Sequence, residues 1–430
     1  MPRAVLTSLL AASIAAVSLA TPAPSAAGPQ ADTRFATFNA SLNRSAPGQL
    51  VTDLSNPAAN TIAVRQARNV AEVIQRSRAD VILINEFDFY RNGQAARLFR
   101  DNFLAVSQNG ARPARYPYYF VAPSNTGVPS GFDLDNSGDT NSADAGNDAF
   151  GFGAFPGQFG MVVYSKHPID HRNARTFRKF LWRDMPAARL PDDPAAPQPA
   201  DWYSPAELDV FRLSSKSHWD LPIAIGKRTV HFLVSHPTPP VFDGPEDRNG
   251  TRNADEIRFW ADYVTPRRSR YIYDDRGRTG GLHPSQLFVI AGDQNSDPLD
   301  GDSLRSASGD PVAIQQLLDS PRINSRRPPT SAGAPEAATL QGGANSTHRS
   351  DPAFDTADFA DFAPGNLRAD YVLPRRNIRI VDSRVFWPVR ADPLSRLTGT
   401  FDFAAWGPVG GFPTSDHRLV WVDLDLPGGR

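Results

Sequence analysis

Residues 286–298 read QLFVIAGDQNSDP, and this stretch joins an apolar run directly to a polar turn. The run LFVIA is typical of a buried strand. Gly292 permits a sharp exit, after which Asp293 and Asn295 would project to the same side of an extended backbone. A carboxylate and an amide aimed at one water or phosphate oxygen can position a nucleophile, although the same letters also suit an Asx-type turn.

Further apolar runs predict strands separated by helices. Residues 62–77 carry apolar side chains at a helical period, and the run VILIN at residues 81–85 follows them. Because short apolar runs separated by a helix usually belong to a helix-covered sheet, we expect a mixed α and β fold. Other strands are expected at residues 34–39, 160–165, 229–235, 286–291, 370–373, 378–386 and 419–424, and another helix at residues 253–264.

Polar side chains stand at or beside the ends of these runs, where open α/β sheets place binding sites. The set consists of Asn39, Glu86, His236, Asp293, Asn295, Asp416 and His417. Each residue alone is also explained as a turn former, a solvated loop residue or an ordinary histidine. Glu86 directly follows a buried run, which suits an oxygen ligand of Mg²⁺. Because polar residues recur at the ends of so many of these runs, one shared site is favoured.

Two further groups of residues are candidates for supporting the site or contacting the substrate. Asp370 in RADYVLP is a candidate partner for His417, since a carboxylate that accepts an imidazole N–H fixes the tautomer and favours the charged form. Candidate substrate contacts, which surface turns or a helix cap explain about as well, are His218, Trp219, Arg248, Asn249, Arg252 and Asn253.

The bulk properties exclude several classes of protein. The 430 residues include no cysteine, so disulfides and thiolate metal sites are excluded. The net charge is −1, and no strong basic run marks a polyanionic partner. Residues 1–27 combine Arg3, an apolar run and small residues, which predicts a cleaved signal peptide and a secreted, soluble protein without a membrane span.

The quoted motifs resemble the endonuclease/exonuclease/phosphatase superfamily, which includes DNase I. The resemblance rests on FNAS at Asn39, INEF at Glu86, SHPT at His236, GDQN at Asp293, ADYV at Asp370 and TSDHR at Asp416. GDQN and SDHR are the most specific pair. The resemblance implies an α+β fold, a four-layer α/β/β/α sandwich. One such domain would span residues 32–428, with insertions near 122–158, 183–220 and 297–366.

The resemblance also implies the role of each residue. Asn39, Glu86 and Asp416 would place a Mg²⁺ or Mn²⁺ ion on the phosphate of the substrate. Asp293 and Asn295 would orient or activate the attacking water. His236 and His417 would bind phosphoryl oxygens and supply protons, with Asp370 supporting His417.

A separate stretch matches a calcium-loop pattern. Its oxygen-bearing positions are Asp133, Asp135, Ser137, Asp139, Asn141 and Asp144, with Gly138 as the turn former. Asp replaces the usual Glu at the last position, and no convincing helices flank the loop. An ordinary loop rich in Asp, Asn and Gly explains the stretch equally well.

The leading hypothesis is a secreted, metal-dependent phosphoesterase, either a phosphatase or a phosphodiesterase, with no stable protein partner. An extracellular nuclease is the alternative, but the near-zero net charge favours a non-polymeric substrate over nucleic acid. A non-catalytic extracellular binding module on the same fold is the alternative from another class. A serine hydrolase is set aside, because no credible GxSxG elbow is present. The substrate, the ester type and the physiological ion stay open.

Overall fold

The strands form two large sheets and one small hairpin. The computed structural model describes residues 1, 32–140, 146–309 and 311–427. The strands are β1 (Thr33–Leu42), β2 (Val81–Phe87), β3 (Tyr118–Phe120), β4 (Met161–Ser165), β5 (Arg175–Thr176), β6 (Trp219–Ile225), β7 (Arg228–Val234), β8 (Leu287–Asp293), β9 (Ala357–Asp358), β10 (Asn366–Leu367), β11 (Asp370–Pro374), β12 (Arg379–Val385) and β13 (Val420–Asp425). The sheet orders are β12-β13-β1-β2-β4-β3 and β11-β8-β7-β6-β5, with β9 and β10 paired separately.

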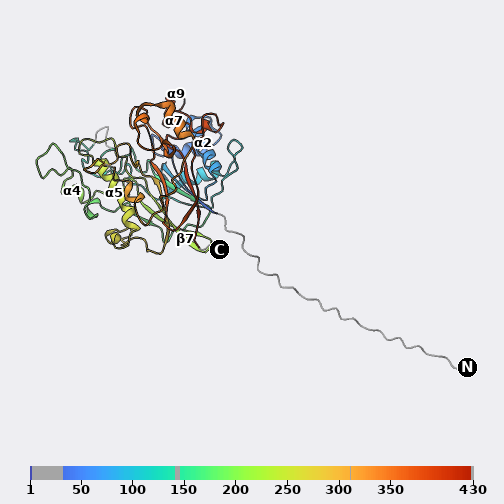
Figure 1. Ribbon diagram of the computed structural model, residues 1–430, viewed down its shortest axis with the longest axis horizontal. Helices are drawn as coiled ribbons and strands as arrows, with labels where there is room; N and C mark the ends of the chain where they lie inside the picture. Colours follow the sequence, from blue (N-terminus) through green and yellow to red (C-terminus); the bar gives the residue numbers. More distant parts are fainter. Residues whose placement is uncertain (2–31, 141–145, 310, 428–430) are drawn as a thin grey trace.

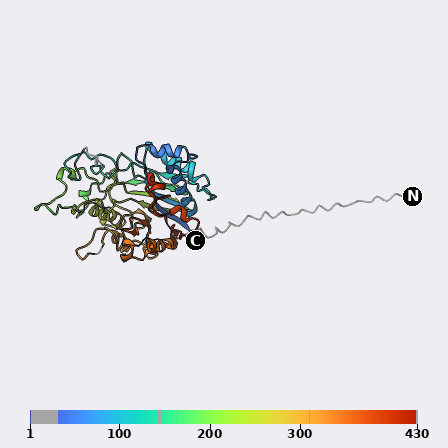
Figure 2. The ribbon, with the colours of Figure 1, turned by 90° about the horizontal axis from the view of Figure 1, so that it is seen from above.

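Helices cover the outer faces of the two sheets. The helices of the described residues are α1 (Gln49–Ser55), α2 (Ile62–Ser77), α3 (Gln94–Phe99), α4 (Pro205–Leu208), α5 (Arg248–Tyr263), α6 (Gln315–Leu318), α7 (Gly333–Gln341), α8 (Ser395–Thr398) and α9 (Phe403–Trp406), of which α1, α2, α3 and α5 pack on the outer faces. In Figures 1 and 2 the blue helix α2 and the yellow helix α5 lie apart, with strands between them. Among the residues described, no helix is long and apolar enough to cross a membrane.

Three buried apolar clusters separate four layers. The cluster between the sheets joins Phe35 of β1 to Phe232 of β7, whose ring centroids lie 5.4 Å apart. A second cluster packs the outer face of the first sheet against α1, α2 and α3. A third packs the outer face of the second sheet against α5 and residues 177–213. The expected α/β/β/α sandwich of the DNase I-like fold is therefore confirmed.

Helix α2 shows why the local sequence forms these elements. The Thr61 hydroxyl caps the helix by accepting a hydrogen bond from the Val64 N–H at 3.2 Å. Its apolar side chains recur at helical spacing, and the face that includes Val64, Val70 and Ile74 is buried. The helix ends at Arg78, which adopts a left-handed conformation.

The expected elements are found, with differences at their bounds. Helix α2 spans the residues expected, whereas α5 begins at Arg248, five residues before its expected start. Strand β2 continues through Phe87, so Glu86 lies inside the strand and does not follow it. Strand β6 begins inside the expected 183–220 interruption and was not expected. The predicted signal peptide, apart from Met1, lies outside the described residues.

The strand pairing brings the two sheets' polar residues to one edge of the sandwich. β1 and β2 run parallel, as do β7 and β8, so in each sheet two strands end at the same edge. Asp370 of β11 pairs directly opposite Asp293 of β8. Gly292 has a φ of +149°, and a Cβ added there would lie 2.0 Å from the Ser235 carbonyl oxygen. Only glycine therefore fits this closely packed strand end.

Candidate functional site

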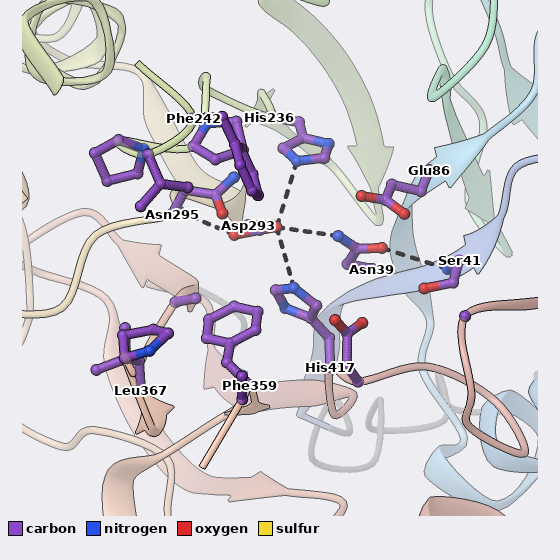
Figure 3. Close-up of a pocket in the computed structure, with 18 of the residues that line it drawn as sticks. Asn39, Ser41, Glu86, His236, Phe242, Asp293, Asn295, Phe359, Leu367 and His417 are labelled. Atoms are coloured by element: carbon purple, nitrogen blue, oxygen red, sulfur yellow. Dashed lines mark hydrogen bonds and ion pairs between the residues drawn. The ribbon is translucent and has the colours of Figure 1, made fainter. Parts of the chain in front are cut away.

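Asp293 lies at the centre of a buried polar cluster. Its Oδ2 accepts a hydrogen bond from Asn39 Nδ2 at 3.0 Å. The Nε2 atoms of His236 and His417 lie 3.3 and 3.6 Å from the same oxygen. Figure 3 shows these three side chains converging on Asp293. Groups from both sheets thus meet at one carboxylate, although almost the whole chain separates Asn39 from His417.

His417 is held between two carboxylates. Its Nδ1 lies 2.8 Å from Asp370 Oδ2, which also accepts a hydrogen bond from the Thr356 hydroxyl at 2.9 Å. Burial disfavours the charged ring, but Asp370 and Asp293 outweigh burial and raise the pKa of His417 well above its usual value. His417 is therefore a cation in the folded protein at neutral pH, as expected for a histidine supported by Asp370.

The pKa of His236 is shifted in the opposite direction from that of His417. Burial, with the positive charges of Lys216 and His417, holds the pKa of His236 well below its usual value. The ring is therefore neutral at neutral pH. Its Nδ1 is buried and has no hydrogen-bond partner among the described residues. The nitrogen that approaches Asp293 is therefore Nε2, whereas Nδ1 is enclosed by the protein.

A second acidic group lies beside this cluster. Burial raises the pKa of Glu86 to about 7, and the charge of Asp416 adds to the rise, whereas His417 and Asn39 act against it. Glu86 has a φ of +55°, a backbone conformation that is uncommon for a residue other than glycine. The Asp416 carboxylate accepts a hydrogen bond from the Ser415 hydroxyl at 3.2 Å. Two carboxylates therefore lie close enough to repel each other.

The oxygen donors of this group fit a divalent cation. Glu86, Asp416 and the Asn39 side chain supply two carboxylates and one amide oxygen, a hard donor set of the kind that Mg²⁺ prefers. A cation between Glu86 and Asp416 would remove the repulsion that raises the Glu86 pKa. Asp293, Asp370 and His417 also lie within 4.8 Å of one another, but hydrogen bonds already join His417 to Asp370. The Asn39 side chain is hydrogen-bonded too, since its Oδ1 accepts from the Ser41 N–H at 3.3 Å, so the predicted ligands are a second set that could hold the ion.

The backbone at Asn295 does not have the extended conformation that was expected. It has a φ of +50°, and its backbone N–H donates to Asp293 Oδ1 at 2.9 Å. The prediction of an extended backbone after Gly292 was therefore wrong, and residues 293–295 form an Asx-type turn. The Asn295 side chain donates to the Pro237 carbonyl at 3.1 Å and lines the same pocket as Asp293.

Several candidate substrate contacts are structural instead. His218 is buried, with Nδ1 2.5 Å from the Ser214 hydroxyl and Nε2 2.9 Å from the Glu256 carbonyl oxygen. Arg252 is buried too, and its Nε donates to the Leu213 carbonyl at 2.9 Å. The remaining candidates, Trp219, Arg248, Asn249 and Asn253, do not line the pocket around Asp293. His218, Asn249, Arg252 and Asn253 form hydrogen bonds between α5 and loops, whereas Trp219 packs between the two sheets; these long-range contacts are not visible in the local sequence.

The calcium-loop residues are described only in part. Asn141 and Asp144 lie outside the described residues. Asp133 accepts hydrogen bonds from the backbone N–H groups of Ser137 and Gly138, at 3.0 and 2.7 Å. Carboxylates of Asp133, Asp135 and Asp148 lie within 4.8 Å of one another, and Asp148 was not among the expected ligands. Asp139 does not belong to that group of three.

One pocket of about 880 Å³ contains the whole cluster. Asn39, Glu86, His236, Asp293, Asn295, Asp416 and His417 all line it, whereas Asp370 lies behind His417. Apolar side chains that the motifs did not identify also line it, among them Phe242, Phe359, Phe362 and Leu367. The sequence feature that could have identified the three phenylalanines is the presence of aromatic residues within polar, proline-containing segments between the predicted strands.

Comparison with known families assigns the chain to a family. The family described as Endonuclease/Exonuclease/phosphatase family matches residues 36–417, a span that runs from before Asn39 to His417. The chain belongs to this family. No curated protein matches it. The matched span contains Asn39, Glu86, His236, Asp293, Asp370 and Asp416, around which the motifs were identified.

Several solved structures of the endonuclease/exonuclease/phosphatase type are similar to the chain. An endonuclease/exonuclease/phosphatase from Beutenbergia cavernae is 16% identical, with a TM-score of 0.47, covering 93% of this chain and 73% of that one. A sphingomyelinase C from Streptomyces griseocarneus is 16% identical, with a TM-score of 0.43, covering 92% and 99%. A mutant beta toxin from Staphylococcus aureus with bound magnesium ions is 14% identical, with a TM-score of 0.41, covering 92% and 100%.

Proposed function

We propose that this chain is a divalent-metal-dependent phosphoesterase that hydrolyses phosphate esters by attack of water. The observation that carries the proposal is the arrangement around Asp293. A buried carboxylate contacts a cationic and a neutral histidine, while the acidic group of Glu86 and Asp416 lies beside it in the same pocket. In-line attack on phosphorus needs an oriented water and neutralised charge more than a covalent nucleophile.

Asp293 and Asn295 are the residues that would orient the water. Burial raises the pKa of Asp293 to about 6, with His417 and Asn39 lowering it and Asp370 raising it. A carboxylate with this pKa is ionised near neutral pH and can accept the proton of the attacking water. The new oxygen–phosphorus bond then forms as the bond to the leaving alcohol breaks.

The two histidines would contact the phosphate differently. His417, a cation fixed by Asp370, can hold a phosphoryl oxygen and supply a proton to the leaving alkoxide. His236, which lines the pocket with its Nε2 near Asp293, would be a second, neutral contact to the phosphate group. Asn39, Glu86 and Asp416 would hold a Mg²⁺ or Mn²⁺ ion, which when bound supplies charge neutralisation at the phosphate.

The test is hydrolysis of p-nitrophenyl phosphate, bis(p-nitrophenyl) phosphate, plasmid DNA and RNA by the purified protein, with Mg²⁺, Mn²⁺ or EDTA. His417→Gln should lower kcat by about 10²-fold to 10⁴-fold, the usual effect of removing a general acid. The matched control is His231→Gln, because His231 forms a similar pair with Asp220, at 2.6 Å, outside the pocket lining. Equal rates in EDTA, or equal losses in both variants, would refute the mechanism.

Nuclease activity is the second candidate, and the charge of the pocket argues against it. Acidic side chains line the pocket, and Arg44 is the one lysine or arginine among its described lining residues. Plasmid DNA or RNA turned over faster than the small esters would favour the nuclease. A binding module on the same fold would bind Mg²⁺ without turnover of any substrate.

Export and calcium binding are separate proposals, supported by the sequence. The N-terminal sequence of protein recovered from the medium tests export and would begin after the small-residue stretch. Calorimetric titration with Ca²⁺ tests the loop, and Asp133→Asn should abolish the binding isotherm if Asp133 is a ligand. A protein retained in cells, or an unchanged isotherm, would contradict the respective proposal.

A further inference from the structure

The pocket is much larger than a phosphate group requires. Its volume of about 880 Å³ lies within the range of about 300 to 1,000 Å³ that is typical of sites for whole small molecules. Figure 3 shows Glu86 and Ser41 on one side of Asp293, and Phe242, Phe359 and Leu367 on the other. The space beside the reacting centre is thus bounded by apolar side chains.

One apolar wall is the segment 239–242, which reads Pro-Pro-Val-Phe. All four residues line the pocket. Phe242 has a φ of +66° and is 87% exposed, so a bulky apolar residue is held in an unfavourable backbone conformation without burial in return. Such strain at an exposed aromatic residue favours a role in binding.

Hydrogen bonds from α5 hold this wall in place. The Thr238 N–H donates to Glu256 Oε2 at 2.6 Å, and the Thr238 carbonyl accepts from Asn253 at 2.8 Å. Asn249 Nδ2 donates to the Val241 carbonyl at 2.7 Å. After Phe242, the Asn249 N–H donates to Asp243 Oδ2 at 2.7 Å, so the loop is anchored on both sides of Phe242 and little ordering is needed when a ligand binds.

The opposite wall is the tip of the β9–β10 hairpin, residues 359–365, together with Leu367. The ring of Phe359 lies edge-on to His417, with centroids 5.3 Å apart. Phe362, farther along the tip, is 86% exposed. The hairpin is tied to the reacting centre, because the Asp358 N–H donates to the Asp416 carbonyl at 2.7 Å and the Asp358 carboxylate pairs with Arg418 at 2.8 Å.

The charges of the pocket restrict the substrate further. The acidic side chains among its described lining residues are Glu86, Asp293, Asp297, Asp302 and Asp416. Arg44 is buried, and its guanidinium donates to Asp53 at 2.7 Å, so its charge is already paired. A polyanion needs arginine or lysine along its path, which this lining does not supply.

Given the proposed hydrolysis, on which this inference rests, we infer that the substrate is a phosphate ester with a single phosphate group and an apolar ester group. The apolar group binds between Phe242 and the hairpin residues Phe359 and Phe362, and the phosphate lies against Asp293, His236 and His417. The two exposed phenylalanines become covered by this group, which accounts for their exposure in the free protein.

The test is calorimetric titration of the full chain with methyl-, butyl- and octylphosphonate in Mg²⁺, each below its micelle concentration. Affinity should rise with chain length, by about threefold to fourfold for each methylene group that becomes buried. Phe242→Ala and Phe362→Ala should each weaken octylphosphonate binding about tenfold or more and leave methylphosphonate binding unchanged. Leu340→Ala is the control, since Leu340 is 62% exposed on α7 and does not line the pocket.

The outcomes separate this inference from the proposed function. Metal-dependent turnover of p-nitrophenyl esters without chain-length dependence would retain the phosphoesterase and overturn the apolar subsite. Chain-length dependence without turnover of any ester would support the subsite and count against the phosphoesterase. Phenylalanine-dependent binding to phosphatidylcholine vesicles, with no chain-length dependence in solution, would overturn the subsite and assign the surface to membrane docking. Failure of octylphosphonate to bind would also overturn it.

Discussion

At the residue scale, identical side-chain types acquire opposite properties from their neighbours. His236 and His417 both approach Asp293, yet the pKa of one falls and that of the other rises. Burial acts in the same direction on both, so the difference comes from neighbouring charges: Asp370 and Asp293 raise the pKa of His417, whereas Lys216 and His417 lower that of His236. One histidine therefore suits a proton donor and the other a neutral contact.

The pKa of Asp355, a residue that does not line the pocket, leads to a prediction about stability. Burial, and then the charges of Asp297, Asp300 and Asp351, raise its pKa to about 9, and its Oδ1 has no hydrogen-bond partner among the described residues. The folded state therefore retains a proton that the unfolded state, with a pKa of about 3.9, has lost. The stability that this proton contributes is complete below about pH 4 and is lost as pH rises toward 9.

Asp355→Asn should consequently melt at a higher temperature than the unsubstituted protein at pH 8, by on the order of a few degrees, with the difference vanishing near pH 4. Differential scanning calorimetry at both pH values measures the effect. The exposed Asp319→Asn serves as the control. A difference that is the same at both pH values would show that Asp355 does not hold this proton.

At the element scale, local signals explain α2 well. Its cap at Thr61 and its buried apolar face agree with each other, so little tertiary information is needed to form it. The β9–β10 hairpin is the opposite case. Its strands are two residues each, and its place beside His417 depends on contacts with Asp416 and Arg418.

Removal of the α2 cap gives an element-scale prediction. Thr61→Ala leaves the Val64 N–H without its side-chain acceptor and should lower the free energy of unfolding by about 1 kcal/mol. Urea denaturation measures this change, and Thr61→Ser should restore most of it. Hydrolysis rates at 25 °C should not change, because Thr61 does not line the pocket. A large loss of activity without a loss of stability would contradict this account.

At the scale of the whole molecule, the site joins the two sheets. Asn39 and Glu86 come from β1 and β2 of one sheet, whereas Asp293 comes from β8 of the other. The Asn39–Asp293 hydrogen bond crosses between them. A cation held beside this junction by the chain's carboxylates should therefore stabilise the folded sandwich as a whole.

Thermal unfolding with and without Mg²⁺ tests this molecular effect. Mg²⁺ at about a hundred times its Kd should stabilise the fold by about 2.7 kcal/mol. Glu86→Gln should lose most of that increment, because one proposed carboxylate ligand is removed. Asp101→Asn, a change at a partly exposed aspartate that is not part of the pocket lining, should retain it. An increment that is equal in all three proteins would place the Mg²⁺ elsewhere.

The sequence by itself determined most of the longer elements and the polar residues at or near their ends, but not β6 or the start of α5. Strand and helix periodicities are local, and they predicted the strands around Asn39 and Asp293 and helix α2. The tertiary structure decided which of these residues meet, the contrast between the two histidines, and the burial of His218. It also placed Phe242 and Phe362 at one pocket. Burial and charge depend on neighbours distant in the chain, and local periodicity does not specify those neighbours.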